Sequence, residues 1–113
     1  MNQYGKQFNP ITSQGVIGVT MDELISSLNK EVNHIKIDVD GNEFLVLKGG
    51  EKTFRSDSLQ SVLIELDYTH MEYKSSVELI ESYGFKLHNI DSEYNKRNRG
   101  DSHSTANHIF LRV

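Results

Sequence analysis

The chain has 113 residues, of which 36% are hydrophobic and 25% are charged, a size and composition typical of one globular domain with a modest core. It contains no cysteine, which excludes disulfides, thiolate zinc sites and a cysteine nucleophile. The formal net charge of −4, with no long apolar run and no basic leader, argues against nucleic-acid and membrane partners and predicts a cytoplasmic protein.

The first part of the chain is predicted to be an arm followed by a strand and a helix. Residues 1–14 are polar and lack periodicity, which favours an N-terminal arm or loop. Residues 16–19 form a short β-like run. It stops at Thr20, which has the capping-box spacing to Glu23, and apolar residues then recur at helical spacing until about Asn29. A helix is therefore expected from Thr20 onward.

The middle of the chain predicts two strands joined by short helices. "HIKIDV", residues 34–39, alternates β-branched and polar residues and reads as a strand. Residues 44–47 are expected on a short helix that ends at Gly49 and Gly50, with a second helical turn over residues 51–54. "SVLIEL", residues 61–66, is a nearly continuous apolar run, as expected for a parallel strand whose two faces are covered by helices.

The last part predicts a helix and a strand pair. A helix is expected over residues 75–83, capped by Ser75 or Ser76 and stopped by Gly84. "FKLHNI", residues 85–90, and "HIFLRV", residues 108–113, flank a polar loop over residues 91–107 and are expected to pair antiparallel. The basic cluster at residues 96–99 reads as part of a solvated loop. The order β, α, β, α, β, α, β, β predicts an α/β layered sheet with right-handed crossovers.

Carboxylates follow the two middle strands. In α/β sheets ligands bind at the carboxyl ends of the strands, so acids that leave two neighbouring strands there are expected to lie side by side. Asp38 and Glu43 favour a functional role, because a carboxylate in or just after an apolar strand carries a desolvation penalty. For Asp40, which is followed by Gly41 and Asn42, an ordinary turn and helix cap is favoured over a functional role. The acids of the second strand are Glu65 and Asp67.

The same acids also have a metal-binding interpretation. "DVDGNE" resembles half of a calcium-binding loop, but with Gly41 at the glycine position the first and last ligands fall on Lys36 and Leu47, which cannot coordinate. One magnesium or calcium ion held by separate loops stays open, as does a stand-alone module that binds a small molecule or metal. Tyr68, His70 and Tyr73 would line an acceptor pocket, with His70 as an alternative general base. A plain surface loop is the competing interpretation.

Several motifs occur in order along the chain and carry a resemblance to a known family. "NHIKIDVDGNEFLVLKGGEKTF", "LQSVLIEL" and "ELIESYGFKL" resemble the C-terminal half of the FkbM-type methyltransferases, whose hallmark reads roughly K-I-D-V-E-G-x-E before a V-L-x-G-A-like turn. "QGVIGVTMDELI" resembles the segment that precedes this hallmark. Asp40 replaces the more usual glutamate, and Gly50 stands where alanine is common. The resemblance covers residues 14–87.

The resemblance implies a Rossmann-like fold that binds S-adenosylmethionine and methylates a hydroxyl on a sugar or secondary metabolite, so that the partner is a small-molecule hydroxyl acceptor. The family's glycine-rich donor turn lies N-terminal to the matched motifs. Residues 15–113 are therefore expected to be the C-terminal half of such a domain, a fragment with little or no turnover by itself.

The resemblance also implies roles for individual acids. Asp38 is the first choice for both donor binding and catalysis, Asp40 is a further donor-binding residue, and Glu43 and Glu65 are further catalytic residues. No metal is expected in this site. In such domains the "KIDV" strand has a neighbour on each side, so its exposure is expected to favour a homodimer through residues 34–39.

Overall fold

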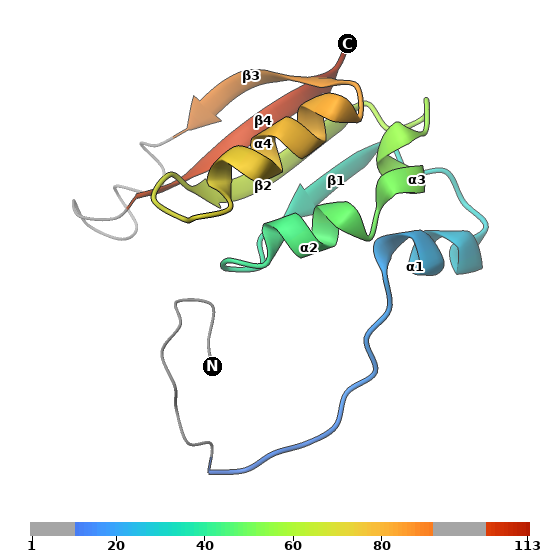
Figure 1. The fold of residues 1–113 in the computed structure, drawn as a ribbon. Helices are drawn as coiled ribbons and strands as arrows, with labels where there is room; N and C mark the ends of the chain where they lie inside the picture. Colours follow the sequence, from blue (N-terminus) through green and yellow to red (C-terminus); the bar gives the residue numbers. More distant parts are fainter. Residues whose placement is uncertain (1–10, 92–103) are drawn as a thin grey trace.

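The computed structural model describes residues 11–91 and 104–113, and it shows a mixed α/β fold with one four-stranded sheet (Figure 1). No helix in the described part of the chain is long and apolar enough to cross a membrane. The helices and strands, in chain order, are α1 (Met21–Leu28), β1 (His34–Ile37), α2 (Glu43–Lys48), α3 (Glu51–Arg55), β2 (Ser61–Asp67), α4 (Tyr73–Ser82), β3 (Phe85–Asp91) and β4 (Thr105–Arg112).

The strand order in the sheet is β1-β2-β4-β3. β1 and β2 are parallel, with Ile37 opposite Ile64, and α2 and α3 form the crossover between them. β4 pairs antiparallel with both β2 and β3, which confirms the expected C-terminal antiparallel pair. The sheet is therefore mostly antiparallel, and the expected parallel arrangement is present as one strand pair. The loop expected over residues 91–107 is shorter at both ends, because β3 extends to Asp91 and β4 begins at Thr105. Residues 92–103 of this loop and residues 1–10 of the expected arm lie outside the described part.

The prediction of a strand over residues 16–19 is wrong. These residues have no regular secondary structure, and the side chains of Val16 and Ile17 are 82% and 95% exposed. A strand is stabilised by its neighbours in a sheet more than by its own propensity, and no strand in the described part pairs with this segment. Local β-propensity alone therefore predicted a strand where none forms.

The predicted start of α1 is confirmed. Thr20 Oγ1 accepts a hydrogen bond from the Glu23 amide at 3.1 Å, and the Glu23 carboxylate accepts one from the Thr20 amide at 3.4 Å. Each side chain satisfies one of the amides that a helix leaves without an intrahelical partner. The sequence signal sufficed here because both partners lie within four residues.

α4 begins at Tyr73 and ends at Ser82, so the predicted range of residues 75–83 is displaced toward the C-terminus. Ser75 and Ser76 are not caps, and Ser76 is buried inside the helix. The reason is the turn before the helix, in which the His70 amide donates to the Asp67 carbonyl and the Tyr73 amide donates to the His70 carbonyl, so that winding starts earlier. The predicted stop at Gly84 fits its φ of +101°, which glycine adopts without steric cost.

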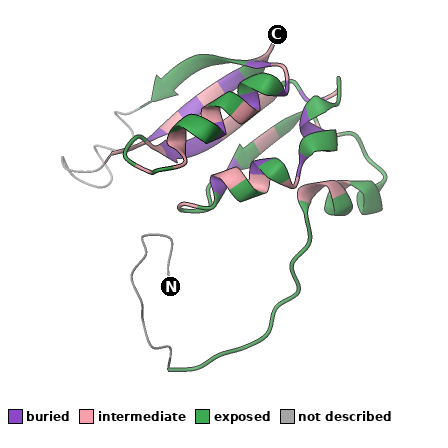
Figure 2. Cartoon of the chain, in the orientation of Figure 1, coloured by how far each residue is buried: buried purple, intermediate pink, exposed green. Residues whose placement is uncertain are grey.

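The hydrophobic core lies between the sheet and the helices α2 and α4, which both lie in front of the sheet in Figure 1, and it includes Phe54 of α3. Figure 2 shows the buried positions concentrated on β2, β4 and the sheet-facing sides of these helices. On the opposite face of the sheet Leu63 and Ile109 are half-buried and Leu111 is exposed. In the described residues the helices thus do not cover both faces of β2, contrary to the expectation. Large fully buried side chains include Leu47, Phe54, Leu59, Ile64, Ile80 and Phe110.

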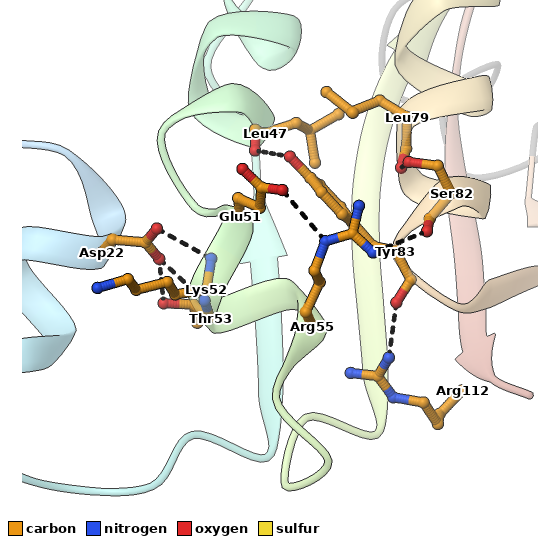
Figure 3. Close-up of polar contacts among 10 residues, drawn as sticks. All are labelled: Asp22, Leu47, Glu51, Lys52, Thr53, Arg55, Leu79, Ser82, Tyr83 and Arg112. Atoms are coloured by element: carbon orange, nitrogen blue, oxygen red, sulfur yellow. Dashed lines mark hydrogen bonds and ion pairs between the residues drawn. The ribbon is translucent and has the colours of Figure 1, made fainter.

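Arg112 joins the end of the sheet to the loops around it. Its guanidinium group donates hydrogen bonds of 2.6–2.9 Å to four backbone carbonyls and lies 4.1 Å from the centroid of the Phe85 ring. Figure 3 shows the bond to Tyr83, whose hydroxyl in turn donates to the Leu47 carbonyl at 2.9 Å. One side chain therefore ties together the ends of α3 and α4 and the start of β2. The four carbonyls belong to Phe54, Ser56, Leu59 and Tyr83.

Replacement of this side chain tests its contribution to stability. Arg112→Lys keeps the charge but replaces a planar fork of donors by a single ammonium group, so several carbonyls lose their partner. We expect the free energy of unfolding, measured with urea, to fall by roughly 2–4 kcal/mol. The control is Lys74→Ala, because the Lys74 side chain is 87% exposed and 3.9 Å from Glu78; it should change stability by less than about 0.5 kcal/mol. Equal effects of the two variants would contradict the role given to Arg112.

Candidate functional site

The turn after β1 positions the first acids of the site. Asp40 and Gly41 have φ angles of +46° and +101°, which reverse the chain between β1 and α2. Glycine adopts this conformation without cost, and aspartate is among the few other residues that tolerate it. Because the turn is tight, Glu43 in the first turn of α2 lies back over it. Its Oε1 accepts a hydrogen bond from the Gly41 amide at 3.1 Å, and the side chain is buried.

The end of β2 supplies the second group of acids. Glu65 is buried within the strand, and Asp67 is its last residue. Asp67 Oδ1 accepts hydrogen bonds from the Thr69 amide at 2.8 Å, the Thr69 hydroxyl at 2.7 Å and the Ser104 hydroxyl at 2.6 Å. These bonds fold the chain after β2 into a turn, which brings His70 back toward the strand end.

The two strand ends enclose a small cavity of about 20 Å³, enough for about one water-sized group. A second hollow of about 10 Å³ shares part of this lining and adds Phe44 and Tyr73. The prediction that the acids of β1 and β2 meet at one edge of the sheet is thus confirmed by the parallel pairing and by this shared lining. The cavity is lined by Asp40, Gly41, Glu43, Glu65, Asp67, His70 and Thr105.

Of the four acids singled out in the sequence, Asp40, Glu43 and Glu65 line the cavity and Asp38 does not. β1 ends at Ile37, and Asp38 follows it as an exposed residue before the turn. Asp38 therefore lies outside the cavity lining, whereas Asp67 joins the lining through the turn that follows it.

The hydrogen bonds of His70 fix which of its ring nitrogens carries a proton. Its Nδ1 accepts a hydrogen bond from the Glu72 amide at 3.1 Å, so in the neutral ring the proton lies on Nε2. A general base needs an available lone pair, and the Nδ1 lone pair is already used. His70 is therefore better suited to donate a hydrogen bond in this cavity than to act as the general base that the sequence suggested.

His108 is a buried polar residue beside the site that was not predicted as functional. Its Nδ1 lies 2.9 Å from the Ala106 carbonyl and must donate, which leaves Nε2 to accept from the Tyr73 hydroxyl at 2.9 Å. Burial lowers the pKa of His108, although the bond to Ala106 opposes this, and burial raises the pKa of Tyr73. Both side chains thus stay neutral near neutral pH. Their rings form a cluster with Tyr68, at centroid distances of 5.4 and 5.5 Å.

The described residues contain no group of three or more histidine, aspartate or glutamate side chains arranged to hold a metal ion. The edge presents carboxylates, together with hydrogen-bond donors such as the His70 ring. These are groups that orient a hydroxyl and complement positive charge.

Comparison with protein families gives a match to the methyltransferase FkbM domain over residues 2–87. The chain belongs to the FkbM methyltransferase family. This confirms the family predicted from the sequence motifs and indicates a methyltransferase-type enzyme. The matched region includes both acid-bearing strand ends of the FkbM domain and all of α4. Comparison with the curated proteins and with the solved structures gives no significant match.

The pKa of Asp67 is lowered by the turn that it organises. Burial alone would raise this pKa, but the hydrogen bonds from Ser104 and Thr69 and the proximity of His70 outweigh burial and bring it below 3.8. Because the folded-state pKa is the lower one, the ionised carboxylate stabilises the fold at pH values above the unfolded-state pKa. This contribution is lost as the pH falls through the folded-state pKa.

Asp67→Asn should therefore lower the free energy of unfolding at pH 7 by roughly 1–2 kcal/mol and flatten its decline between about pH 5 and about pH 3. Urea unfolding across this range measures both effects. Asp57→Asn is the control. Because Asp57 is exposed, this variant should change the free energy of unfolding by less than about 0.5 kcal/mol. An unchanged pH profile of Asp67→Asn would show that the turn does not depend on the charge.

Proposed function

We propose that this chain is the acid-bearing part of an FkbM domain that transfers a methyl group from S-adenosylmethionine to a hydroxyl of a small molecule in the cytoplasm, such as a sugar or secondary metabolite. The acidic edge of the sheet is where the reacting groups meet in that domain, and the chain by itself has little or no turnover. The observation that carries this proposal is the convergence of four carboxylates, from Asp40, Glu43, Glu65 and Asp67, on one small cavity. The β1-crossover-β2 unit is of the kind from which Rossmann-like sheets are built, and it supports that fold for the domain.

The charge and size of the cavity fit this donor in a specific way. Carboxylates complement the positive charge of the donor's sulfonium and ammonium groups. The enclosed volume of about 20 Å³ accepts only a terminal group, so the bulk of a donor or acceptor would lie outside the cavity, across the exposed edge. Asp38 lies next to this edge and is exposed, which suits contact with the methionine portion of the donor.

The bound donor supplies an activated methyl group, and the residues of the edge handle the proton. As the acceptor oxygen forms its bond to carbon, its proton must leave, and a positioned carboxylate can take it. Glu43 is the best placed of the acids because it is buried and is held by the Gly41 amide. His70 complements it by donating a hydrogen bond from Nε2 to an oxygen of the acceptor. Glu65 lies in the same lining and is proposed to orient the acceptor.

Calorimetric titration of the 113-residue chain with S-adenosylmethionine tests the proposal, because donor binding is measurable without turnover. We expect binding that is weakened about tenfold by Glu43→Gln or Asp40→Asn, which corresponds to about 1.4 kcal/mol for each lost interaction. Asp57→Asn is the matched control, since Asp57 lies before the start of β2, at the opposite end of that strand, and should leave the affinity unchanged.

The same titration discriminates between the alternatives. Heat with magnesium chloride but none with the donor would favour a metal-binding module without methyltransferase activity. Donor binding that is equal in all variants would show that the donor does not use the acidic edge.

A further inference from the structure

The sheet ends at β1, and one edge of this strand has no neighbouring strand within the described residues. Its sequence, His-Ile-Lys-Ile, contains no proline, and its pairing with β2 shows no irregularity of register. An extended edge of this kind presents backbone donors and acceptors to any further strand. β1 is therefore ready to accept a fifth strand.

A second segment of the same chain has strand-forming residues but no neighbouring strand in the described part of the chain. Residues 16–19 have strong β-propensity, lie in a stretch from residue 7 to residue 21 without any charged side chain, and are exposed throughout. Figure 1 shows the described part of this segment running away from the sheet and helices. Val19 is 61% exposed, in addition to the high exposures of Val16 and Ile17. Four residues match the length of the four-residue β1.

An apolar groove continues from this segment onto the body of the domain. It encloses about 410 Å³ between α1 and α2, and its lining includes Val19, Leu24 and Leu45. Leu24 and Leu45 are 48% and 63% exposed, so this is a solvent-facing apolar surface. The β1 edge, residues 16–19 and this groove together define what we call the β1 side of the molecule.

The base of the exposed segment is held firmly. In the first turn of α1 the Asp22 carboxylate accepts hydrogen bonds from the amides of Lys52 and Thr53 and from the Thr53 hydroxyl, at 2.8–2.9 Å (Figure 3). The Asp22 amide also donates to the Gly49 carbonyl at 3.0 Å. Residues 16–19 therefore leave the domain from a fixed point.

We propose that two copies of this chain pair through their β1 sides, with residues 16–19 of each copy added as a strand to the β1 edge of the other. A two-fold axis makes such an exchange self-complementary, because each copy gives one segment and accepts one. The added strand satisfies the open edge of β1 and buries the valine and isoleucine side chains. A homodimer through residues 34–39 is expected from the sequence, and the exchange names residues 16–19 of the second copy as the segment that pairs with them. This proposal does not depend on the proposed methyl transfer.

The charges favour this exchange over direct pairing of two β1 edges. Direct pairing would bring Lys36 of each copy to the same short interface, where like charges repel each other. Residues 16–19 carry no charge, so they meet Lys36 without repulsion. The second copy therefore offers its uncharged segment as the better partner for β1.

Cysteine crosslinking tests the geometry directly, because the chain has no cysteine of its own. Single cysteine variants at each of residues 16–19 are mixed with Lys36→Cys carrying a size tag, and disulfides are allowed to form. Adjacent strands are about 4.8 Å apart, so the residue of the added strand directly opposite Lys36 is within disulfide range, whereas the next residue on the same face is about 7–8 Å away. We expect the mixed crosslink to exceed the crosslinks between identical variants about fivefold. Crosslinks only between two Lys36→Cys chains, or none, would overturn the proposal.

A charge placed in the segment tests the energetics. Ile17→Lys should weaken the dimer at least about tenfold, measured by light scattering over a concentration series, because the added ammonium group is either repelled by Lys36 or placed without a partner against apolar side chains. Ile11→Lys is the matched control, since Ile11 is 101% exposed and lies outside the exchanged strand; it should shift the dissociation constant less than about twofold. Both side chains are exposed in the monomer, so circular dichroism should show an unchanged fold. A monomer at all concentrations up to about 0.5 mM, or equal effects of both variants, would refute the exchange.

Discussion

The parallel pairing of β1 with β2 is the constraint on which the site depends. Because the two strands run the same way, with Ile37 opposite Ile64, the turn after β1 and the turn after β2 leave the sheet at the same edge. An antiparallel pair would send them to opposite ends and separate Glu43 from Asp67. The crossover makes this pairing possible, and the bond from the Tyr83 hydroxyl to the Leu47 carbonyl joins it to the end of α4. Backbone direction thus decides which carboxylates meet.

Much of this arrangement could be predicted because its signals are local. The capping box at Thr20, the strands around Ile37 and Ile64 and the stop at Gly84 each depend on residues within a few positions of one another. The expectation that acids after two neighbouring strands lie together followed from the general position of ligand sites at the carboxyl ends of strands in α/β sheets. The prediction of a strand over residues 16–19 was wrong because strand formation does not depend on local residues alone. The β-propensity of residues 16–19 is real, but a strand needs a neighbour, and no pattern within the segment specifies one.

The remaining features depend on contacts between distant parts of the chain. The place of β4 between β2 and β3 is fixed by pairing across the sheet, which hydrophobic alternation does not encode. The exclusion of Asp38 from the cavity follows from the early end of β1. The proton position on His70 follows from one backbone amide, and the contacts of Arg112 join residues more than fifty positions apart. These are properties of the assembled fold.

Asp67 takes part in two features of the structure, the cavity and the start of β4. It lines the acidic cavity, and it accepts a hydrogen bond from the hydroxyl of Ser104, the residue directly before the start of β4. The Tyr68 amide adds a second link by donating to the Ser104 carbonyl at 3.1 Å. A charged group that enters the cavity and draws on this carboxylate therefore also competes with the hydroxyl that anchors the entry to β4. Occupancy at the sheet edge and order at the start of the last strand are in this way thermodynamically linked.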